Sequence, residues 1–143
     1  MKSDPSSPRF APEIRLPAAG EGGALAQAVA LHRAGRLIDA ERVYKQILEA
    51  LPKQPDALHN MGVLQMQCTN PAAAVPWFHA ALEAQPENPQ CWLSYAEALL
   101  EAGEAADARM VLDAGREAGL RGEEVDMLEL RVISAVMSDG LLT

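Results

Sequence analysis

The stretch PDALHNMGVLQMQCTNPAAAVPWFHAALEAQP, from Pro55 to Pro86, sets the pattern of the whole chain. When it is shifted by 34 residues in either direction, it falls on related residues. The superposed positions agree in size: Ala40, Ala74 and Ala108; Tyr44, Phe78 and Leu112; and Pro52 and Pro86. Small and large side chains that recur at this period are typical of a repeated pair of packed helices. The chain is therefore predicted to be a stack of helix pairs.

Apolar residues at helical spacing predict two helices in each repeat and a seventh helix after them. The repeats are expected at about residues 24–54, 55–88 and 89–122, the extra helix at 123–138 and a tail at 139–143. Gly62 is expected to let the second helix of its pair approach closely. Gly119 and Leu120 suggest a helix end with a left-handed glycine followed by an apolar residue that folds back.

Residues 1–23 are rich in Pro, Gly and Ser and show no helical or alternating period. This composition predicts a disordered or extended leader. Its large apolar residues are Phe10, Ile14 and Leu16. Both a plain tail and a segment docked into a groove are compatible with them.

Composition restricts the classes of function. The net charge of −8 and the pI of about 4.8 argue against a nucleic-acid-binding protein, which would need a basic face. Cys68 and Cys91 lack the partners that a metal site requires, and no metal or other cofactor is expected. No apolar run is long enough to span a membrane and no secretory signal is seen. A cytoplasmic location is expected.

The three units resemble tetratricopeptide repeats. In the second unit the family pattern is filled almost completely, by Leu58, Met61, Gly62, Ala74, Phe78, Ala81 and Pro86. Gln65 stands where an aromatic residue is usual, and the third unit lacks the closing proline. The resemblance implies an all-α, right-handed superhelical solenoid of three helix pairs with a C-terminal capping helix.

Two longer phrases resemble a narrower group, the amino-terminal repeats of bacterial SPINDLY-like and O-GlcNAc-transferase-like glycosyltransferases. They are GRLIDAERVYKQILEALPKQPDALHNMGVL, residues 35–64, and WLSYAEALLEAGEAADARMVLDAGREAGLRGEEVDML, residues 92–128. The 143 residues hold no catalytic domain of that class, nor a phosphate-binding loop or an activated nucleophile. This chain is therefore not expected to be an enzyme, although a longer parent could be a glycosyltransferase.

Binding is the favoured function, because stacked helix pairs present a concave surface lined by their first helices. Asn60 is the most suggestive residue, since an asparagine side chain can bond the C=O and N–H of a peptide together. The related repeats carry such an asparagine at the same position of successive first helices. Here Ala26 and Ser94 occupy that position in the first and third repeats, so Asn60 is the one asparagine of the series. The predicted peptide-binding groove consists of Val29, His32, Arg33, His59, Asn60, Val63, Met66, Gln67, Ser94, Glu97 and Glu101.

Leu25 and Val29 stand where repeats that bind acidic chaperone tails need polar and basic residues, which argues against that ligand. The expected partner is a protein or peptide, recruited for a glycosyltransferase-like protein. Two alternatives stay open. One is a stand-alone chaperone or adaptor for apolar segments of a secreted protein, and the other is a dimerisation unit that pairs through the C-terminal helix.

Overall fold

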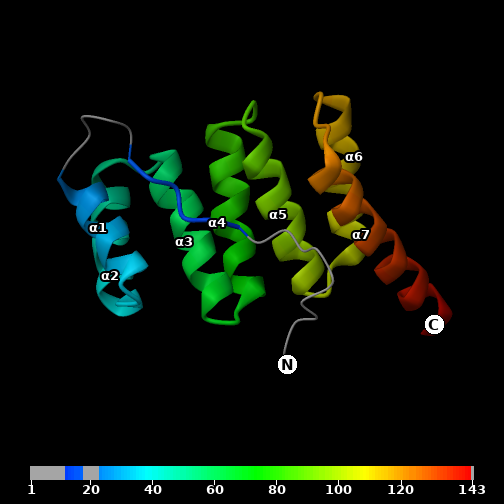
Figure 1. The fold of residues 1–143 in the computed structure, drawn as a ribbon, viewed down its shortest axis with the longest axis horizontal. Coiled ribbons are helices and arrows are strands. Elements are labelled where there is room, and N and C mark those ends of the chain that lie inside the picture. Colours follow the sequence, from blue (N-terminus) through cyan, green and yellow to red (C-terminus); the bar gives the residue numbers. More distant parts are fainter. Residues whose placement is uncertain (1–11, 18–22, 143) are drawn as a thin grey trace.

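The computed structural model describes residues 12–17 and 23–142 of the chain (Figure 1). Over these residues the backbone forms seven α-helices and no strand. The helices are α1 (Ala24–Arg33), α2 (Leu37–Ala50), α3 (Pro55–Gln67), α4 (Pro71–Ala84), α5 (Pro89–Glu101), α6 (Ala105–Glu117) and α7 (Glu123–Leu142). The all-α fold class predicted from the repeat pattern is confirmed.

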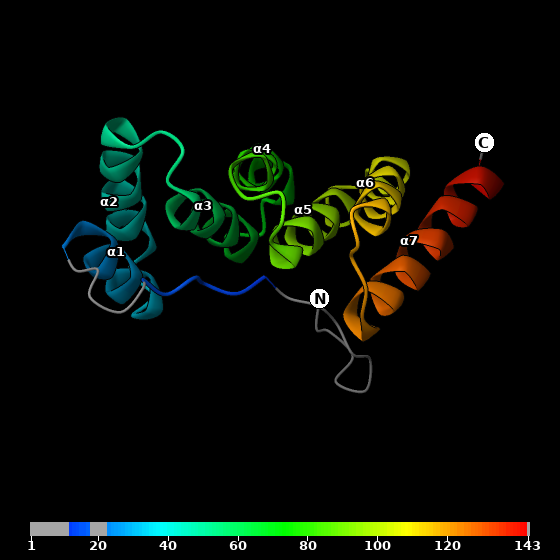
Figure 2. The same cartoon turned by 90° about the horizontal axis from the view of Figure 1, so that it is seen from above.

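Helices adjacent in sequence pack as pairs, α1 with α2, α3 with α4 and α5 with α6, and the pairs stand side by side in one row (Figure 1). The last helix, α7, closes the row against α6 and α5. Seen from above, α1, α3 and α5 lie toward one side of the row, and α2, α4 and α6 lie toward the other (Figure 2). We call the surface of α1, α3 and α5 the inner face.

Three helices begin in the same way, with a capping side chain followed by proline. The caps are Gln54 for α3, Asn70 for α4 and Asn88 for α5. In α3 the backbone N–H of Ala57 donates to Oε1 of Gln54 at 2.6 Å. Proline suits the first helical position because its missing N–H would have had no partner in the helix. These residues therefore fix where each repeat starts.

The first helix of each repeat ends at one left-handed residue. Gly35, Thr69 and Gly103 occupy this position in the three repeats, with φ of 80°, 57° and 85°. Glycine adopts this conformation freely, whereas a β-branched threonine is strained in it. The second repeat thus keeps its turn at a cost that the other two avoid.

The centre of the second repeat depends on Gly62, as predicted. A Cβ atom added to Gly62 would lie 2.5 Å from Cε1 of Phe78, whose ring is fully buried. The aligned residues Tyr44 and Leu112 are buried in the other two repeats. The period of 34 residues read from the sequence therefore corresponds to one repeated packing position, and each repeat fills it with a different large side chain.

The predicted end of α6 is confirmed. Gly119 has a φ of 103°, and the N–H of Leu120 donates to the carbonyl of Gly115 at 2.8 Å. The end of α7 differs from the prediction, because the helix continues through Gly140 to Leu142 instead of stopping at residue 138. A glycine in an exposed helix costs only about 1 kcal/mol relative to alanine, which is too little to end the helix by itself.

The predicted leader is described only at residues 12–17, which form no helix or strand. They run along the inner face, past α1 and α3 (Figure 2). The remaining leader residues of the prediction, 1–11 and 18–22, including Phe10, lie outside the described residues.

Candidate functional site

A pair of hydrogen bonds joins residues 12–17 to the middle of the inner face. The backbone N–H of Arg15 donates to Oδ1 of Asn60 at 2.6 Å, and Nδ2 of Asn60 donates to the carbonyl of Arg15 at 2.9 Å. One amide side chain thus satisfies both backbone groups of one residue. Asn60 is fully buried with this segment in place. The arrangement is that of a receptor holding an extended peptide by its backbone.

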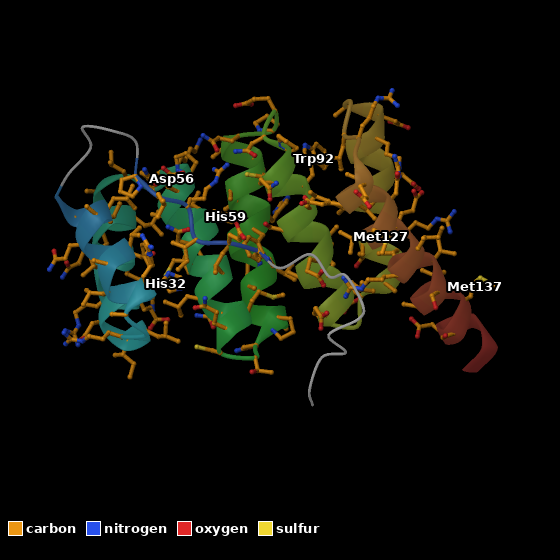
Figure 3. All side chains as sticks on the ribbon, in the orientation of Figure 1. His32, Asp56, His59, Trp92, Met127 and Met137 are labelled. Carbon is orange, nitrogen blue, oxygen red and sulfur yellow. The ribbon has the colours of Figure 1, made fainter. Side chains whose placement is uncertain are left out.

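The side chain of Arg15 reaches the ends of two helices. Its Nη1 donates to Oε1 of Gln85 at 2.7 Å and lies 3.5 Å from Oδ1 of Asp56. Gln85 caps the C-terminus of α4, and Asp56 lies in the first turn of α3, beside the segment (Figure 3). The guanidinium is mostly shielded from water, with 18% of the side chain exposed. These two acceptors form a seat for a cation.

The neighbouring residue, Ile14, contributes apolar contact. It is half-buried and packs against two core clusters, one that includes Val29 and another that includes Val63. Glu13 and Leu16 on either side are exposed. Ile14 and Arg15 are therefore the side chains through which the segment engages the helices most specifically.

His59 lies beneath the segment and links α3 to α5. Its Nε2 is 2.8 Å from Oγ of Ser94, and its ring packs 5.2 Å from that of Phe78. Burial, aided by the positive charge of Arg15, lowers the pKa of His59 to about 4. Its Nδ1 has no hydrogen-bond partner among the described residues. His59 is therefore a neutral packing residue that joins two repeats at physiological pH.

His32 makes a similar link between the first and second repeats. Its Nε2 lies 2.8 Å from Oε1 of Gln67 and its Nδ1 lies 2.9 Å from the hydroxyl of Tyr44. Because the carbonyl oxygen of Gln67 can only accept, Nε2 carries the proton and Nδ1 accepts from Tyr44. Burial lowers the pKa of His32. This network ties α1 and α2 to α3.

A buried carboxylate occupies the far end of the inner face. Glu97 is 2% exposed and pairs with Arg131 of α7 through two contacts of 2.7 and 3.1 Å. Arg131 also donates to Oε1 of Glu101 at 3.1 Å. Burial raises the pKa of Glu97, and the guanidinium opposes that rise. The ion pair holds α7 against α5.

The structure divides the predicted groove residues into two groups. One group is buried between helices and consists of Val29, His32, His59, Asn60, Val63, Ser94 and Glu97. The other is partly or well exposed and consists of Arg33, Met66, Gln67 and Glu101. Asn60 is the buried polar residue of the first group that bonds the bound segment; His32, His59, Ser94 and Glu97 bond other helices.

Four residues that the sequence analysis did not select complete the site, namely Arg15, Asp56, Gln85 and Arg131. The signal for Arg15 was its position beside Ile14, an apolar residue in a polar leader. Asp56 and Gln85 lie at helix termini, where polar residues are common. Nothing in their local sequence shows that the two termini meet at one point in space.

The cysteine, histidine and acidic residues of the described chain do not form a metal site. Within them, no three His, Cys, Asp or Glu side chains are grouped so that they could hold a metal ion. Cys91 is buried, and burial raises the pKa of its thiol, which disfavours the reactive thiolate. A search of residues 12–17 and 23–142 finds no helix with the length and apolarity needed to cross a membrane.

Two large apolar side chains of α7 are exposed. Leu130 and Met137 are each 64% exposed, and Figure 3 shows Met127 and Met137 along this helix. A shallow pocket of about 490 Å³ lies between α5 and α7, lined by Leu100, Leu130, Arg131, Ser134 and Ala135. This pocket extends the inner face beyond the Glu97–Arg131 pair.

Comparison with known proteins supports the repeat assignment. The tetratricopeptide repeat family matches residues 69–131, which run from the end of α3 into α7. No curated protein sequence gives a significant match to the chain. The repeat architecture predicted from the sequence is thus found both in the family match and in the fold.

Solved structures with this fold include two kinds of protein. The TPR2B domain of yeast Sti1, in complex with pHsp70, superposes with a TM-score of 0.68 at 19% identity, covering 78% of this chain and 94% of that domain. The Yersinia enterocolitica type III secretion chaperone SycD, in complex with a peptide of the translocator YopD, gives a TM-score of 0.63 at 21% identity, covering 81% and 88%. A second SycD structure gives 0.61 at 19% identity, covering 87% and 90%. These similarities establish the fold.

Proposed function

We propose that this chain is a protein-interaction module that binds an extended protein segment along its inner face. The observation that carries the proposal is the pair of hydrogen bonds between the side chain of Asn60 and the backbone of Arg15. The segment 12–17 supports the proposal, because it runs along the inner face and belongs to no helix of the solenoid (Figure 2).

The chemistry of the clamp suits a peptide more than a folded surface. An extended backbone presents an N–H and a C=O at each residue, whereas a helix has already paired most of its own groups. Asn60 is buried, so its amide would lack partners if the face were covered by apolar side chains alone. Peptide backbone satisfies both ends of the amide at once.

The structural neighbours support a function of this class. The Sti1 domain and SycD were both solved with peptide or protein ligands, on a fold that covers about four fifths of this chain. The ligand of this chain would differ in charge from an acidic tail, because the acceptors at the clamp are Asp56 and Gln85. The face is thus better suited to a segment that carries a cation.

Two biological settings fit the module. The first is the recruiting end of a glycosyltransferase-like protein, supported by the resemblance of residues 35–64 and 92–128 to the repeats of such enzymes. The second is a free-standing chaperone, supported by the shared fold with SycD. Dimerisation through α7 is a further proposal, based on the exposed Leu130 and Met137.

A peptide screen with matched variants tests the function. To keep the segment 12–17 from competing for the face, all chains in the test carry Arg15→Glu. An array of extended peptides is probed with this parent chain, with Asn60→Ala added to it and with Ser94→Ala added to it, which changes the same position of the next repeat. We expect Asn60→Ala to weaken binding by about tenfold, since two hydrogen bonds to the ligand are lost, and Ser94→Ala to retain it. N-methylation of the clamped residue in a bound peptide should have the same effect as Asn60→Ala.

Unchanged binding in Asn60→Ala would contradict the proposal. Met66→Glu provides an independent test of the apolar part of the same face. Met66 packs with Ile14 against the cluster that includes Val63, so a carboxylate there should also weaken binding.

A further inference from the structure

We propose that the inner face selects a segment in which a branched apolar residue is followed by a basic residue, and that the chain's own Ile14–Arg15 occupies this site as a tethered competitor. The inference rests on the proposed peptide-binding function and adds the ligand class and its regulation. Three sets of contacts carry it, to the backbone, to the arginine and to the isoleucine.

The hydrogen bonds from Asn60 to the backbone fix the position of the segment on the inner face, but they do not select its sequence. Asn60 contacts only the N–H and C=O of Arg15, groups that every residue except proline presents. The bonds from Asn60 do determine which residue of the segment places its side chain at the termini of α3 and α4. Sequence selection must therefore come from the side chains on either side of this anchored backbone.

The arginine seat provides the first selection. Gln85 and Asp56 place two oxygen acceptors near one guanidinium, with Nη1 to Oε1 and Oδ1 distances of 2.7 and 3.5 Å. Both contacts are made by the same nitrogen of Arg15, so the two acceptors select a positive charge at this position. A glutamate at this position would be repelled by Asp56. The seat is therefore specific for a basic side chain.

The apolar contacts of Ile14 are the second source of sequence selection. In an extended segment adjacent side chains point in opposite directions, so residues 14 and 15 can reach different parts of the face. Ile14 packs against clusters from the first and second repeats, while Arg15 reaches the helix ends. Leu16 is 59% exposed and contributes little. The recognised unit is thus a dipeptide, apolar then basic.

Prolines on both sides make the segment a good resident ligand. Pro12 and Pro17 fix their own φ angles, and Pro17 disfavours a helical conformation at Leu16, which lowers the entropy lost on docking. Residues 18–23 connect the segment directly to α1, so its effective concentration at the face is high. A free peptide must displace this tethered copy before it can bind.

Direct titration of the full chain tests the inference. The probe is a fluorescent peptide with the sequence of residues 12–17, PEIRLP, and the chains are wild type and Arg15→Glu. Repulsion from Asp56 should release the tethered copy, so Arg15→Glu is expected to bind the probe at least roughly tenfold more tightly than wild type. Arg109→Glu, which makes the same charge change at an exposed position of α6, should bind like wild type.

Sequence selection and tethering are measured separately. A probe with glutamate in place of arginine should not bind the Arg15→Glu chain. In hydrogen exchange of the wild-type chain, the amide of Arg15 should be protected, and Asn60→Ala should remove that protection. The protection should not depend on protein concentration.

The outcomes separate this inference from the proposed function. Equal, Asn60-dependent affinity of wild type and Arg15→Glu for the probe would overturn the tethered competitor while peptide binding stands. Equal affinity for arginine and glutamate probes would overturn the selection of a basic residue. Protection that falls on dilution would mean that the segment binds a second copy of the chain, which also overturns the tethered form. If no peptide of any sequence binds either chain, the proposed function itself fails.

Discussion

The two ends of the inner face use the same helix geometry for different purposes. At the α3 end, Val63 and its neighbours pack against Ile14, and Asn60 holds the backbone of Arg15. At the α5 end, Glu97 occupies the repeat position that Val63 occupies in α3, and it is paired with Arg131 of α7. One end thus holds a segment from outside the solenoid, and the other holds the next helix.

This difference shows what decides whether a repeat holds a segment from outside the solenoid or the next helix of the stack. Consecutive first helices present equivalent positions to one another, and polar residues that are 34 or 35 positions apart meet there: His32 with Gln67, His59 with Ser94 and Glu97 with Arg131. Where both partners come from helices, the contact is structural. Asn60 instead bonds residue 15, which belongs to no helix, and the proposed peptide site depends on this difference.

Removal of Arg131 should have the largest effect on stability, and it should disrupt only the contact between α5 and α7. Arg131→Ala leaves Glu97 buried without its cation, which should lower the free energy of unfolding by about 3 kcal/mol at pH 7. The deficit should shrink as the pH falls toward the usual range for glutamate, because protonation removes the buried charge. Urea unfolding at several pH values measures this.

The double variant Glu97→Gln with Arg131→Ala is the control for that experiment, since the neutral amide has nearly the same shape. It should recover a large part of the lost stability and lose the pH dependence. A deficit that persists in the double variant would show that lost packing, and not the ion pair, holds α7.

Acidification should weaken the contact between α3 and α5 that His59 makes. Its folded pKa of about 4 lies below the ordinary value of 6.5, so the unfolded chain binds a proton that the folded chain excludes between these values. Stability from this residue is therefore complete above about pH 6.5 and is lost toward pH 4, by about 3 kcal/mol in total. His59→Gln should show a smaller loss over that range than wild type. His79→Gln, at an exposed position of α4, should follow wild type.

Two glycines allow the packing of the two ends to be compared directly. Gly62→Ala would place a Cβ 2.5 Å from the buried ring of Phe78 and should cost about 2 kcal/mol, even after the gain in helix propensity. Gly115→Ala meets the end of the flexible Leu120 side chain at 2.8 Å and should cost less. Equal costs in urea unfolding would contradict the expectation that the contact at Gly62 is the tighter of the two.

The smallest expected change is a gain in stability. Thr69 has a φ of 57° where the other repeats place glycine, so Thr69→Gly should stabilise the fold by about 1 kcal/mol. Gly103→Thr, the reverse exchange in the third repeat, should destabilise it by a similar amount. Thermal unfolding of the two variants checks the sign of both effects.

Much of the fold was accessible from the sequence. The repeat of Ala40, Ala74 and Ala108 predicted the close helix contacts, and all three are buried. Gly62 and the Gly119–Leu120 turn were correctly interpreted because their function is local and depends on the glycine itself. The end of α7 was placed too early, because the sequence signal for a stop, a single exposed glycine, is weak.

The site was accessible only in part. Asn60 was selected because its chemistry and its place on a first helix both indicated a peptide clamp. The histidines and Glu97 were expected in the groove for the same reasons, yet their bonds are made to other helices. Exposed and inter-helix positions share the same polar residue types, so residue type alone does not separate them.

The sequence by itself determined the helices, their pairing and the order of the repeats, because these depend on periodic apolar residues and on capping and turn residues close to one another in the chain. Only the tertiary structure decided what Asn60 binds and which acceptors receive Arg15. Those contacts join residues 41, 45 and 70 positions apart. The stacking of whole repeats brings such residues together, and a short stretch of sequence does not show which distant residues will meet.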